Sequence, residues 1–245
     1  MEISNLNGAS RRITKLSPGI HDPNRVNVFI DDEFSFSLNL AQIVDFKLKV
    51  GQLVSETDLE KYKKASEFGK LYQRTLEWVL AHPRSIYETR KHLQDKRKKR
   101  EIENRHAVEN RKLKTDAAYF GHDRPKRLKT KELPLFSDED IEAIIARLIE
   151  HKYLDDEHFA RFYLENRNTT KGSSTKKLRQ ELAKKGIDQR LIDELFSENL
   201  RNDDEEIRKI IAKKRHKYDD ERLINYLVRQ GFDYQLSRAA VAETD

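Results

Sequence analysis

The chain has 245 residues, of which 38% are charged and 36% hydrophobic, and its formal net charge is +6. Globular domains average about 25% charged residues, so this composition argues against one thick core and favours small units arranged along the chain. The absence of cysteine excludes disulfides, cysteine–zinc sites and thiol nucleophiles. The N-terminus lacks a basic region followed by an apolar stretch, and no window approaches about 18 apolar residues, so we expect a cytoplasmic protein without a membrane span.

Residues 1–55 carry the strand signals of the chain. Residues 26–30 and 34–38 alternate between apolar and polar side chains, and three acidic residues lie between the two runs. This pattern predicts a β-hairpin. Two further segments are candidate strands, residues 12–16 and 46–50. We therefore expect a small N-terminal β extension in a protein that is otherwise mainly α-helical.

Residues 56–151 are predicted to form a first helical unit. Ser55 opens a capping-box pattern, and the apolar stripe that follows stops at Pro83, because proline disfavours helical geometry in the residue before it. A second helix is expected to begin near Ser85. A third helix, capped by Ser137, keeps its apolar residues at the i, i+3, i+4, i+7 spacing of one helix face.

A basic insertion, residues 94–134, splits this first unit. It holds 14 Lys or Arg and 7 Asp or Glu, a local excess of +7, so the rest of the chain is close to neutral. Its apolar residues are scattered, which leaves a projecting exposed helix and a frayed basic arm as alternatives, followed by a loop over residues 121–134. Such a block favours an acidic partner, either nucleic acid or a protein surface, and a solvated spacer is the alternative.

The C-terminal part of the chain repeats itself with an offset of 45 residues. Six residues of one copy match six of the other: Leu178, Leu182, Gly186, Ile187, Asp188 and Leu191 match Leu223, Leu227, Gly231, Phe232, Asp233 and Leu236. Each copy predicts a helix, a left-handed Gly, a capping Asp and another helix. With helices expected from Phe159 and Ile207, a second and a third three-helix unit span residues 152–199 and 200–245. Three tandem units favour an elongated, curved stack.

Four short runs, taken in order, resemble the RecX family of recombination regulators: WVLAHPRS (78–85), YLDDEHFA (153–160), KG (171–172) and LAKKGI (182–187). Residues 25–30 and 65–70 look like the N-terminal extension of some members. The chain departs from the family at Lys152, where a Gly is common, and at the basic insertion, where a short link is usual. The resemblance covers most of residues 65–242.

The resemblance implies a function in recombination, DNA repair and the SOS response. RecX-like proteins lie in the groove of the RecA filament on single-stranded DNA and bridge neighbouring subunits. They depress ATP hydrolysis and strand exchange. What it implies here is a non-enzymatic monomer that modulates RecA, most simply as an inhibitor, and that needs no cofactor. A direct nucleic-acid binder that acts through residues 94–134 is the alternative.

The acidic run within residues 153–159 resembles a metal or catalytic site at first sight. Consecutive carboxylates on a helix point about 100° apart, whereas a metal site needs ligands that converge on one ion. Acids are stabilising at helix N-termini, where Asp also caps free N–H groups. We therefore predict neither a catalytic nor a metal site here, and interpret the run as a joint between the first two helical units. The predicted joint comprises Tyr153, Leu154, Asp155, Asp156 and Phe159.

Basic residues are the candidate site for binding RecA or DNA phosphates. One cluster, from Arg167 to Arg179, frames a helix start whose free N–H groups could add to a phosphate or carboxylate site. Cations near helix C-termini are stabilising by themselves, so a structural role is the alternative for the later groups. The candidate residues are Arg84, Arg167, Lys171, Lys176, Lys177, Arg179, Lys184, Lys185, Lys213, Lys214 and Arg215.

Overall fold

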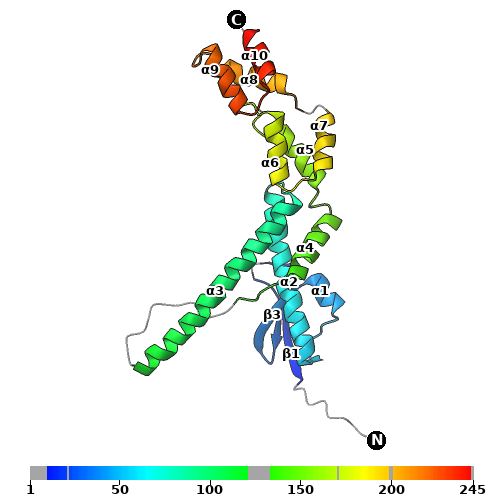
Figure 1. The fold of residues 1–245 in the computed structure, drawn as a ribbon. Helices are drawn as coiled ribbons and strands as arrows, with labels where there is room; N and C mark the ends of the chain where they lie inside the picture. The colour runs from blue at the N-terminus through cyan, green and yellow to red at the C-terminus, as the bar shows by residue number, and fades with distance from the viewer. Residues whose placement is uncertain (1–9, 21, 121–132, 170, 199–200, 244–245) are drawn as a thin grey trace. The chain divides into compact units, whose positions relative to one another are not determined.

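The computed structural model describes residues 10–20, 22–120, 133–169, 171–198 and 201–243, with the side chains of all these except 113–120. Over these ranges it has four strands and ten helices (Figure 1), which confirms a mainly α-helical fold with a small β-rich N-terminal part. None of the described helices combines the length and the apolar character needed to cross a membrane.

The described residues divide into two compact units. Unit 1 comprises the residues up to Glu77 and those from Lys99 to Asp140, and unit 2 comprises Trp78–Lys98 and the residues from Ile141 onward. All three boundaries between the units fall within helices. The finer domain boundaries drawn from the sequence, 1–55, 56–151, 152–199 and 200–245, stay predictions.

Unit 1 contains an antiparallel sheet with the strand order β3-β2-β1-β4. Its strands are β1 (Arg11–Pro18), β2 (Arg25–Ile30), β3 (Glu33–Asn39) and β4 (Leu53–Val54). The predicted hairpin is confirmed, because β2 pairs with β3 and places Val28 opposite Phe36. Asp31 and Asp32 make its turn with positive φ angles. Since side chains alternate between the two faces of a strand, Val28 and Phe36 both point into the core.

The prediction of a strand over residues 46–50 is wrong. A helix, α1 (Leu40–Asp45), follows β3 directly, because Asn39 and Gln42 form a capping box. The side chain of Asn39 accepts from the Gln42 N–H at 2.7 Å, and the Gln42 side chain accepts from the Asn39 N–H at 3.0 Å. After α1 the chain turns at Lys47, whose φ is 50°, and Leu48 is buried in the core. The strand that pairs with β1 at this edge of the sheet is β4 instead.

The helix α2 (Glu56–Ala81) begins and ends where the sequence predicts. Ser55 Oγ accepts from the Asp58 N–H at 3.1 Å, and the helix stops before Pro83. Leu59 and Tyr62 of α2 pack with the inward residues of the sheet in one hydrophobic core. Each such buried side chain contributes about 1.5–3 kcal/mol, so α2 and the sheet stabilise each other.

The helix α3 (Ile86–Phe120) extends through most of the basic insertion, which favours the exposed helix over the frayed arm. The side chain of Asn104 exchanges hydrogen bonds of 2.8 and 2.6 Å with the backbone of Leu133, and Arg100 Nη1 donates to the Pro134 carbonyl at 2.6 Å. Burial lowers the pKa of the Arg100 guanidinium. Part of the insertion is therefore engaged in the packing of unit 1. Most of the predicted loop, residues 121–132, lies outside the described residues.

The remaining helices are α4 (Asp138–Glu150), α5 (Asp156–Asn166), α6 (Thr175–Lys184), α7 (Gln189–Ser197), α8 (Asp203–Lys214), α9 (Asp220–Arg229) and α10 (Tyr234–Ala242). The internal repeat is confirmed, since α6 and α7 recur as α9 and α10 with an offset of 45 residues. The helices α5, α6 and α7 share one hydrophobic core, and α8, α9 and α10 share another.

Three helices of unit 2 end in the same left-handed turn, known as the Schellman motif. At the end of α6, Gly186 has a φ of 79°, and at the end of α9, Gly231 has a φ of 96°. At the end of α4 the equivalent residue is Lys152, with a φ of 58°. The Tyr153 N–H donates to the Leu148 carbonyl at 2.8 Å, as the motif requires. A lysine therefore adopts the backbone geometry for which glycine is best suited.

Lys152→Gly is expected to raise the free energy of unfolding by about 1 kcal/mol, because glycine removes the contact between Cβ and the carbonyl that disfavours positive φ. Urea unfolding followed by circular dichroism measures this gain. The matched control is Lys152→Ala, which removes the same ammonium but keeps Cβ. An equal gain in both variants would mean that the charge, and not the backbone, was the unfavourable feature.

Candidate functional site

Two joints made of the same hydrogen bonds connect successive helical segments within unit 2. In the first joint, Ser85 Oγ donates to the Lys185 carbonyl at 2.6 Å and accepts from the Glu88 N–H at 3.0 Å. The Ile86 N–H next to it donates to Asp156 Oδ1 at 2.8 Å. The serine thus caps its own helix and holds the end of α6, while the next residue holds the start of α5.

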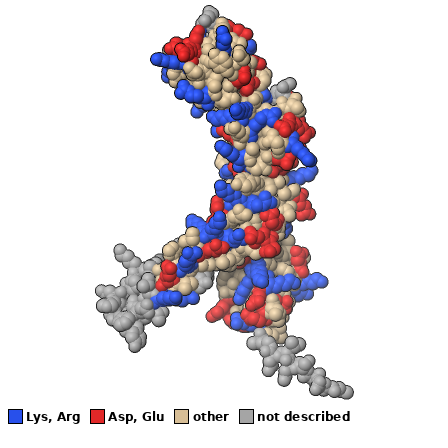
Figure 2. All heavy atoms as spheres, in the orientation of Figure 1, with Lys and Arg blue, Asp and Glu red and all other residues tan. Residues whose placement is uncertain are grey.

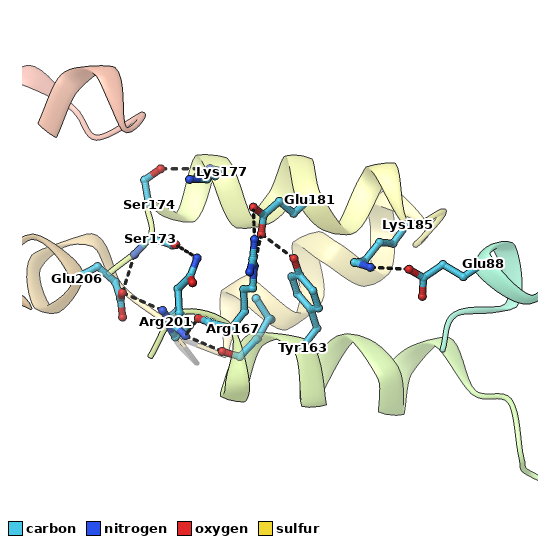
Figure 3. A network of polar contacts seen from close by, with 12 residues as sticks. Glu88, Tyr163, Arg167, Ser173, Ser174, Lys177, Glu181, Lys185, Arg201 and Glu206 are labelled. Carbon is cyan, nitrogen blue, oxygen red and sulfur yellow. Dashed lines mark hydrogen bonds and ion pairs between the residues drawn. The ribbon is translucent and has the colours of Figure 1, made fainter. Parts of the chain in front are cut away.

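The second joint repeats this arrangement one segment further along. Ser174 Oγ donates to the Gln230 carbonyl at 2.8 Å. It also accepts from the Lys177 N–H at 3.2 Å (Figure 3). The Thr175 N–H donates to Asp203 Oδ1 at 2.7 Å. Lys185 and Gln230 both precede a left-handed glycine, and Asp156 and Asp203 are both the first residue of a helix. Because every residue of the first joint has an equivalent in the second, the two joints are copies of one structural motif.

Each joint also requires its glycine for close approach. A Cβ on Gly186 would lie 2.3 Å from Tyr87 Cβ, and a Cβ on Gly231 would lie 2.8 Å from Ser174 Oγ. The glycines that end α6 and α9 therefore serve two purposes, because they allow the left-handed turn and leave room for the neighbouring segment.

The aspartates of the two joints have a shared electrostatic property. Burial raises the pKa of Asp156 and of Asp203, and the hydrogen bonds from Ile86 and Thr175 oppose this only in part. Because the pKa of each carboxyl is higher in the folded chain than in the unfolded chain, folding favours the protonated form. The stability gained from protonation is fully present below the unfolded-state pKa and is lost as the pH rises through the folded-state pKa. Each of the two carboxylates accepts a hydrogen bond from a backbone N–H, which fits a structural role.

Ser85→Ala and Ser174→Ala are each expected to lower the free energy of unfolding by about 2 kcal/mol, because each removes a helix cap and a partly buried hydrogen bond to a carbonyl of another segment. Ser137→Ala is the matched control, since Ser137 Oγ accepts from the Asp140 N–H at 3.2 Å and bonds to no distant segment among the described residues. Its expected loss is about 1 kcal/mol. Equal losses in all three variants, measured by urea unfolding, would show that capping alone matters.

The residues of the predicted joint have different environments. Leu154 and Phe159 are buried, and Asp155 caps α5 by accepting from the N–H groups of Glu157 and His158 at 2.9 and 3.1 Å. Tyr153 is 43% exposed, so it packs less than predicted. The sequence reasoning missed the two serines. Their signal was local: each caps a helix that begins just after a break in the helical pattern.

Several of the predicted partner-binding cations are engaged in ion pairs within unit 2. Arg167 donates to both oxygens of Glu181, at 3.0 and 3.1 Å, and the Tyr163 hydroxyl donates to the same carboxylate at 2.7 Å (Figure 3). Burial, together with this bond, raises the pKa of Tyr163 to about 12. Three further cations have carboxylate partners: Arg179 with Asp193, Lys185 with Glu88 and Arg215 with Asp220.

Four of the other predicted cations have no ion-pair partner among the described residues. Three of them, Lys176, Lys177 and Lys184, lie on α6, and Lys171 lies in the turn before it. The three lysines of α6 line a groove of about 390 Å³ together with Arg229. Figure 2 shows Lys and Arg side chains gathered over α6. The structure therefore brings the α6 lysines together, whereas Lys213, Lys214 and Arg215 lie at the end of α8.

A second groove, of about 710 Å³, adjoins the first and shares Lys184 and Glu181 with it. Trp78 lines this groove and contacts one cation and one aromatic ring. The Arg84 guanidinium lies 4.4 Å from the centre of the Trp78 ring, and the His92 ring stacks on the Trp78 ring at a centroid distance of 4.1 Å. Burial, with Lys96 and Arg84 nearby, lowers the pKa of His92, so this imidazole is neutral at neutral pH. Arg84 Nε is buried and has no hydrogen-bond partner within the part of the chain that the structure describes.

No group of three or more His, Asp or Glu side chains is placed to hold a metal ion in the part of the chain that the structure describes. The acidic run that starts α5 is divided between two tasks, since Asp155 caps the helix and Asp156 binds the Ile86 N–H. The candidate functional site is therefore the pair of adjoining cationic grooves beside α6, with the two joints that position the helices around them.

Comparison with known proteins identifies relatives of the whole chain. Residues 11–55 match the family model of the regulatory protein RecX N-terminal domain, and residues 155–195 match that of the second three-helix domain of RecX. The regulatory protein RecX of Bacillus licheniformis is 27% identical over 241 residues, which cover 95% of this chain and 77% of that protein. For the regulatory protein RecX of Listeria monocytogenes the identity is 24% over 240 residues, with 95% and 75% covered.

A solved structure gives the same result for the fold. The crystal structure of a regulatory protein RecX matches with a TM-score of 0.62 at 19% identity, and the match covers 92% of this chain and 96% of that one. Because the N-terminal sheet, the second three-helix segment and relatives over nearly the full length agree, the chain belongs to the RecX family of regulatory proteins.

Proposed function

We propose that this chain modulates the RecA recombinase by docking along the RecA filament on single-stranded DNA, where it depresses ATP hydrolysis and strand exchange. In this proposal it acts as a non-enzymatic cytoplasmic monomer. Membership of a family of regulatory proteins supports a regulatory role. The observation that carries the proposal is the joint used twice, which relates successive helical segments of unit 2 by one repeated contact.

A filament presents the same surface at each subunit, and a protein with repeated segments can engage several such surfaces at once. Linked weak contacts raise the overall affinity by orders of magnitude when the geometry permits simultaneous binding. The lysines of α6, which have no carboxylate partner among the described residues, are available for one such contact. Bridging neighbouring subunits would oppose the rearrangements that accompany each cycle of ATP hydrolysis.

The test uses RecA assembled on single-stranded DNA, with ATP hydrolysis, strand exchange and co-sedimentation as readouts. Wild-type protein should lower both activities and sediment with the filament, but not with free RecA. The triple variant Lys176→Glu, Lys177→Glu, Lys184→Glu should require at least tenfold more protein for the same effect. Unchanged hydrolysis and strand exchange at saturating wild-type protein would contradict the proposal.

Direct nucleic-acid binding is the second candidate, and the basic face of α3 favours it. Lys98, Lys99, Arg105 and Lys112 are exposed and have no recorded ion pair among the described residues. This candidate predicts DNA affinity without RecA that falls steeply with salt. The variant Lys98→Glu, Lys99→Glu, Arg105→Glu carries the same charge change as the α6 triple variant and serves as its matched control. Loss of RecA modulation in this variant alone would favour the second candidate.

A further inference from the structure

The two grooves beside α6 form one cationic surface, because Lys184 and Glu181 line both of them. Two of the acids on this surface, Glu88 and Glu181, are neutralised by Lys185 and Arg167. The lining cations without a carboxylate partner among the described residues are Arg84, Lys91, Lys176, Lys177, Lys184 and Arg229. Of the acids that line the two grooves, Asp95 is the one without an ion pair among the described residues. The surface is therefore complementary to a ligand with several negative charges.

Two of the aromatic side chains of the surface, Trp78 and Tyr163, do not suit stacking with nucleic-acid bases. Trp78 is covered on one face by Arg84 and on the other by His92. The Tyr163 hydroxyl is held by Glu181. Single-stranded nucleic acids bind proteins through exposed rings interleaved with cations, and these rings are engaged already. In addition, Asp95, which has no ion pair among the described residues, lies among the cations, where it would repel a continuous chain of phosphates.

Arg84 has the properties of an anchor for a carboxylate. Its guanidinium is stacked on Trp78, so it is held in place before any ligand arrives, and its Nε is buried without an acceptor. A planar guanidinium binds a carboxylate through two parallel hydrogen bonds, which gives both strength and direction. Next to it, Tyr87 is 45% exposed and offers an apolar contact for a neighbouring side chain.

We propose that this surface binds an acidic peptide segment of a partner protein, with one carboxylate on Arg84 and others on Lys91, Lys184 and the lysines at the start of α6. The inference deepens the proposed function, on which it rests, by giving the chemistry of the partner segment. A peptide fits where a phosphate chain does not, because its acidic side chains can be spaced singly so that none lies against Asp95. Its apolar residues can contact Tyr87.

The test measures fluorescence anisotropy of two labelled probes with the full-length chain. One probe is a peptide of about ten residues, rich in Asp and Glu with two leucines, which in extended form at about 3.3 Å per residue exceeds the length of α6. The other is an oligothymidylate of equal charge. We expect saturable binding of the peptide and at least tenfold weaker binding of the oligothymidylate at physiological salt. Equal or tighter binding of the oligothymidylate would overturn the inference in favour of nucleic acid.

Two variants localise the peptide on the surface. Lys91→Glu with Lys184→Glu should weaken peptide binding at least tenfold, and Lys98→Glu with Lys99→Glu, on α3 and outside the lining of the groove, should leave it unchanged. Arg84→Lys keeps the charge but loses the planar fork, so we expect about a tenfold loss, equivalent to about 1.4 kcal/mol. Equal effects of the two double variants would overturn the assignment of the site.

The same experiments separate this inference from the proposed function. If the wild-type chain depresses the RecA activities but binds no acidic peptide, the inference fails and the proposed function stands. If the chain binds the peptide through Lys91 and Lys184 but leaves both RecA activities unchanged, the acidic-peptide site stands and the proposed partner is wrong.

Discussion

Gly186→Ala is expected to lower the free energy of unfolding by about 2–4 kcal/mol. The left-handed backbone at φ 79° accounts for about 1–2 kcal/mol of this loss, since any Cβ is disfavoured there. The remainder arises from crowding, because the new Cβ would lie 2.3 Å from Tyr87 Cβ and the two segments must move apart. Tyr87 Cβ cannot rotate away, so the first joint must distort.

Urea unfolding followed by tryptophan fluorescence measures this loss with a reporter that lies close to the substitution. Trp78 is the one tryptophan of the chain and lies in the groove of unit 2, close to the first joint. The matched control is Gly51→Ala, because Gly51 also has a positive φ, of 89°, but nothing lies within 4 Å of the position of its Cβ. A loss at Gly186 no larger than that at Gly51 would show that the close contact with Tyr87 costs nothing.

Glu206→Ala is expected to lower the free energy of unfolding by about 3–5 kcal/mol, because it leaves a buried cation unpaired. Glu206 is 1% exposed, and its carboxylate lies 2.8 Å from Arg201 Nη2 and 2.7 Å from Lys209 Nζ. It also accepts from the Ser173 N–H at 2.9 Å, which ties α8 to the turn before α6 (Figure 3). Removal of this carboxylate breaks all three contacts at once.

The matched control for this prediction is Glu198→Ala, which removes the exposed partner of Arg161. Since water screens that pair, its loss should be much smaller. Comparable losses in the two variants, measured by urea unfolding, would contradict the view that burial gives Glu206 its importance.

The dependence on pH gives a second readout for Glu206. Burial would raise its pKa, but Lys209, Arg201 and the Ser173 N–H together lower it below the usual value. A lowered folded-state pKa means that this contribution to stability is present above the unfolded-state pKa, near 4.5, and is lost as the pH falls through the folded value. The wild-type chain should therefore lose stability on acidification, and Glu206→Ala should lose less. Parallel pH curves for the two proteins would exclude this linkage.

The sequence predicted the elements whose causes lie within a few residues. Capping by Ser55, Ser137 and Asp155 depends on side chains two or three positions from the N–H groups they accept from. The hairpin follows from strict alternation around an acidic turn. The strand predicted over residues 46–50 was wrong because the capping box of Asn39 and Gln42 starts a helix at Leu40, and the chain turns directly after that helix, at Lys47, whose φ is 50°.

The candidate site could be predicted only in part, for the same physical reason. The sequence correctly placed cations on α6, but whether a cation is free depends on its neighbours in space. Arg167 is paired with Glu181 from another helix, whereas Lys184, three residues after Glu181, has no recorded partner among the described residues. Spacing along the chain does not distinguish these cases, because both residues are basic and lie near helix ends.

By itself, then, the sequence determined the helical repeat, the glycines that end its helices and the caps that begin them, because backbone geometry and hydrogen bonds within one turn fix these features. Only the tertiary structure decided how the segments are joined. Ser85 and Lys185 are 100 residues apart along the chain, and Ser174 and Gln230 are 56 apart, so nothing local links them. Their hydrogen bonds form only after hydrophobic packing has brought helix ends together, and the same packing leaves the lysines of α6 without a carboxylate partner among the described residues.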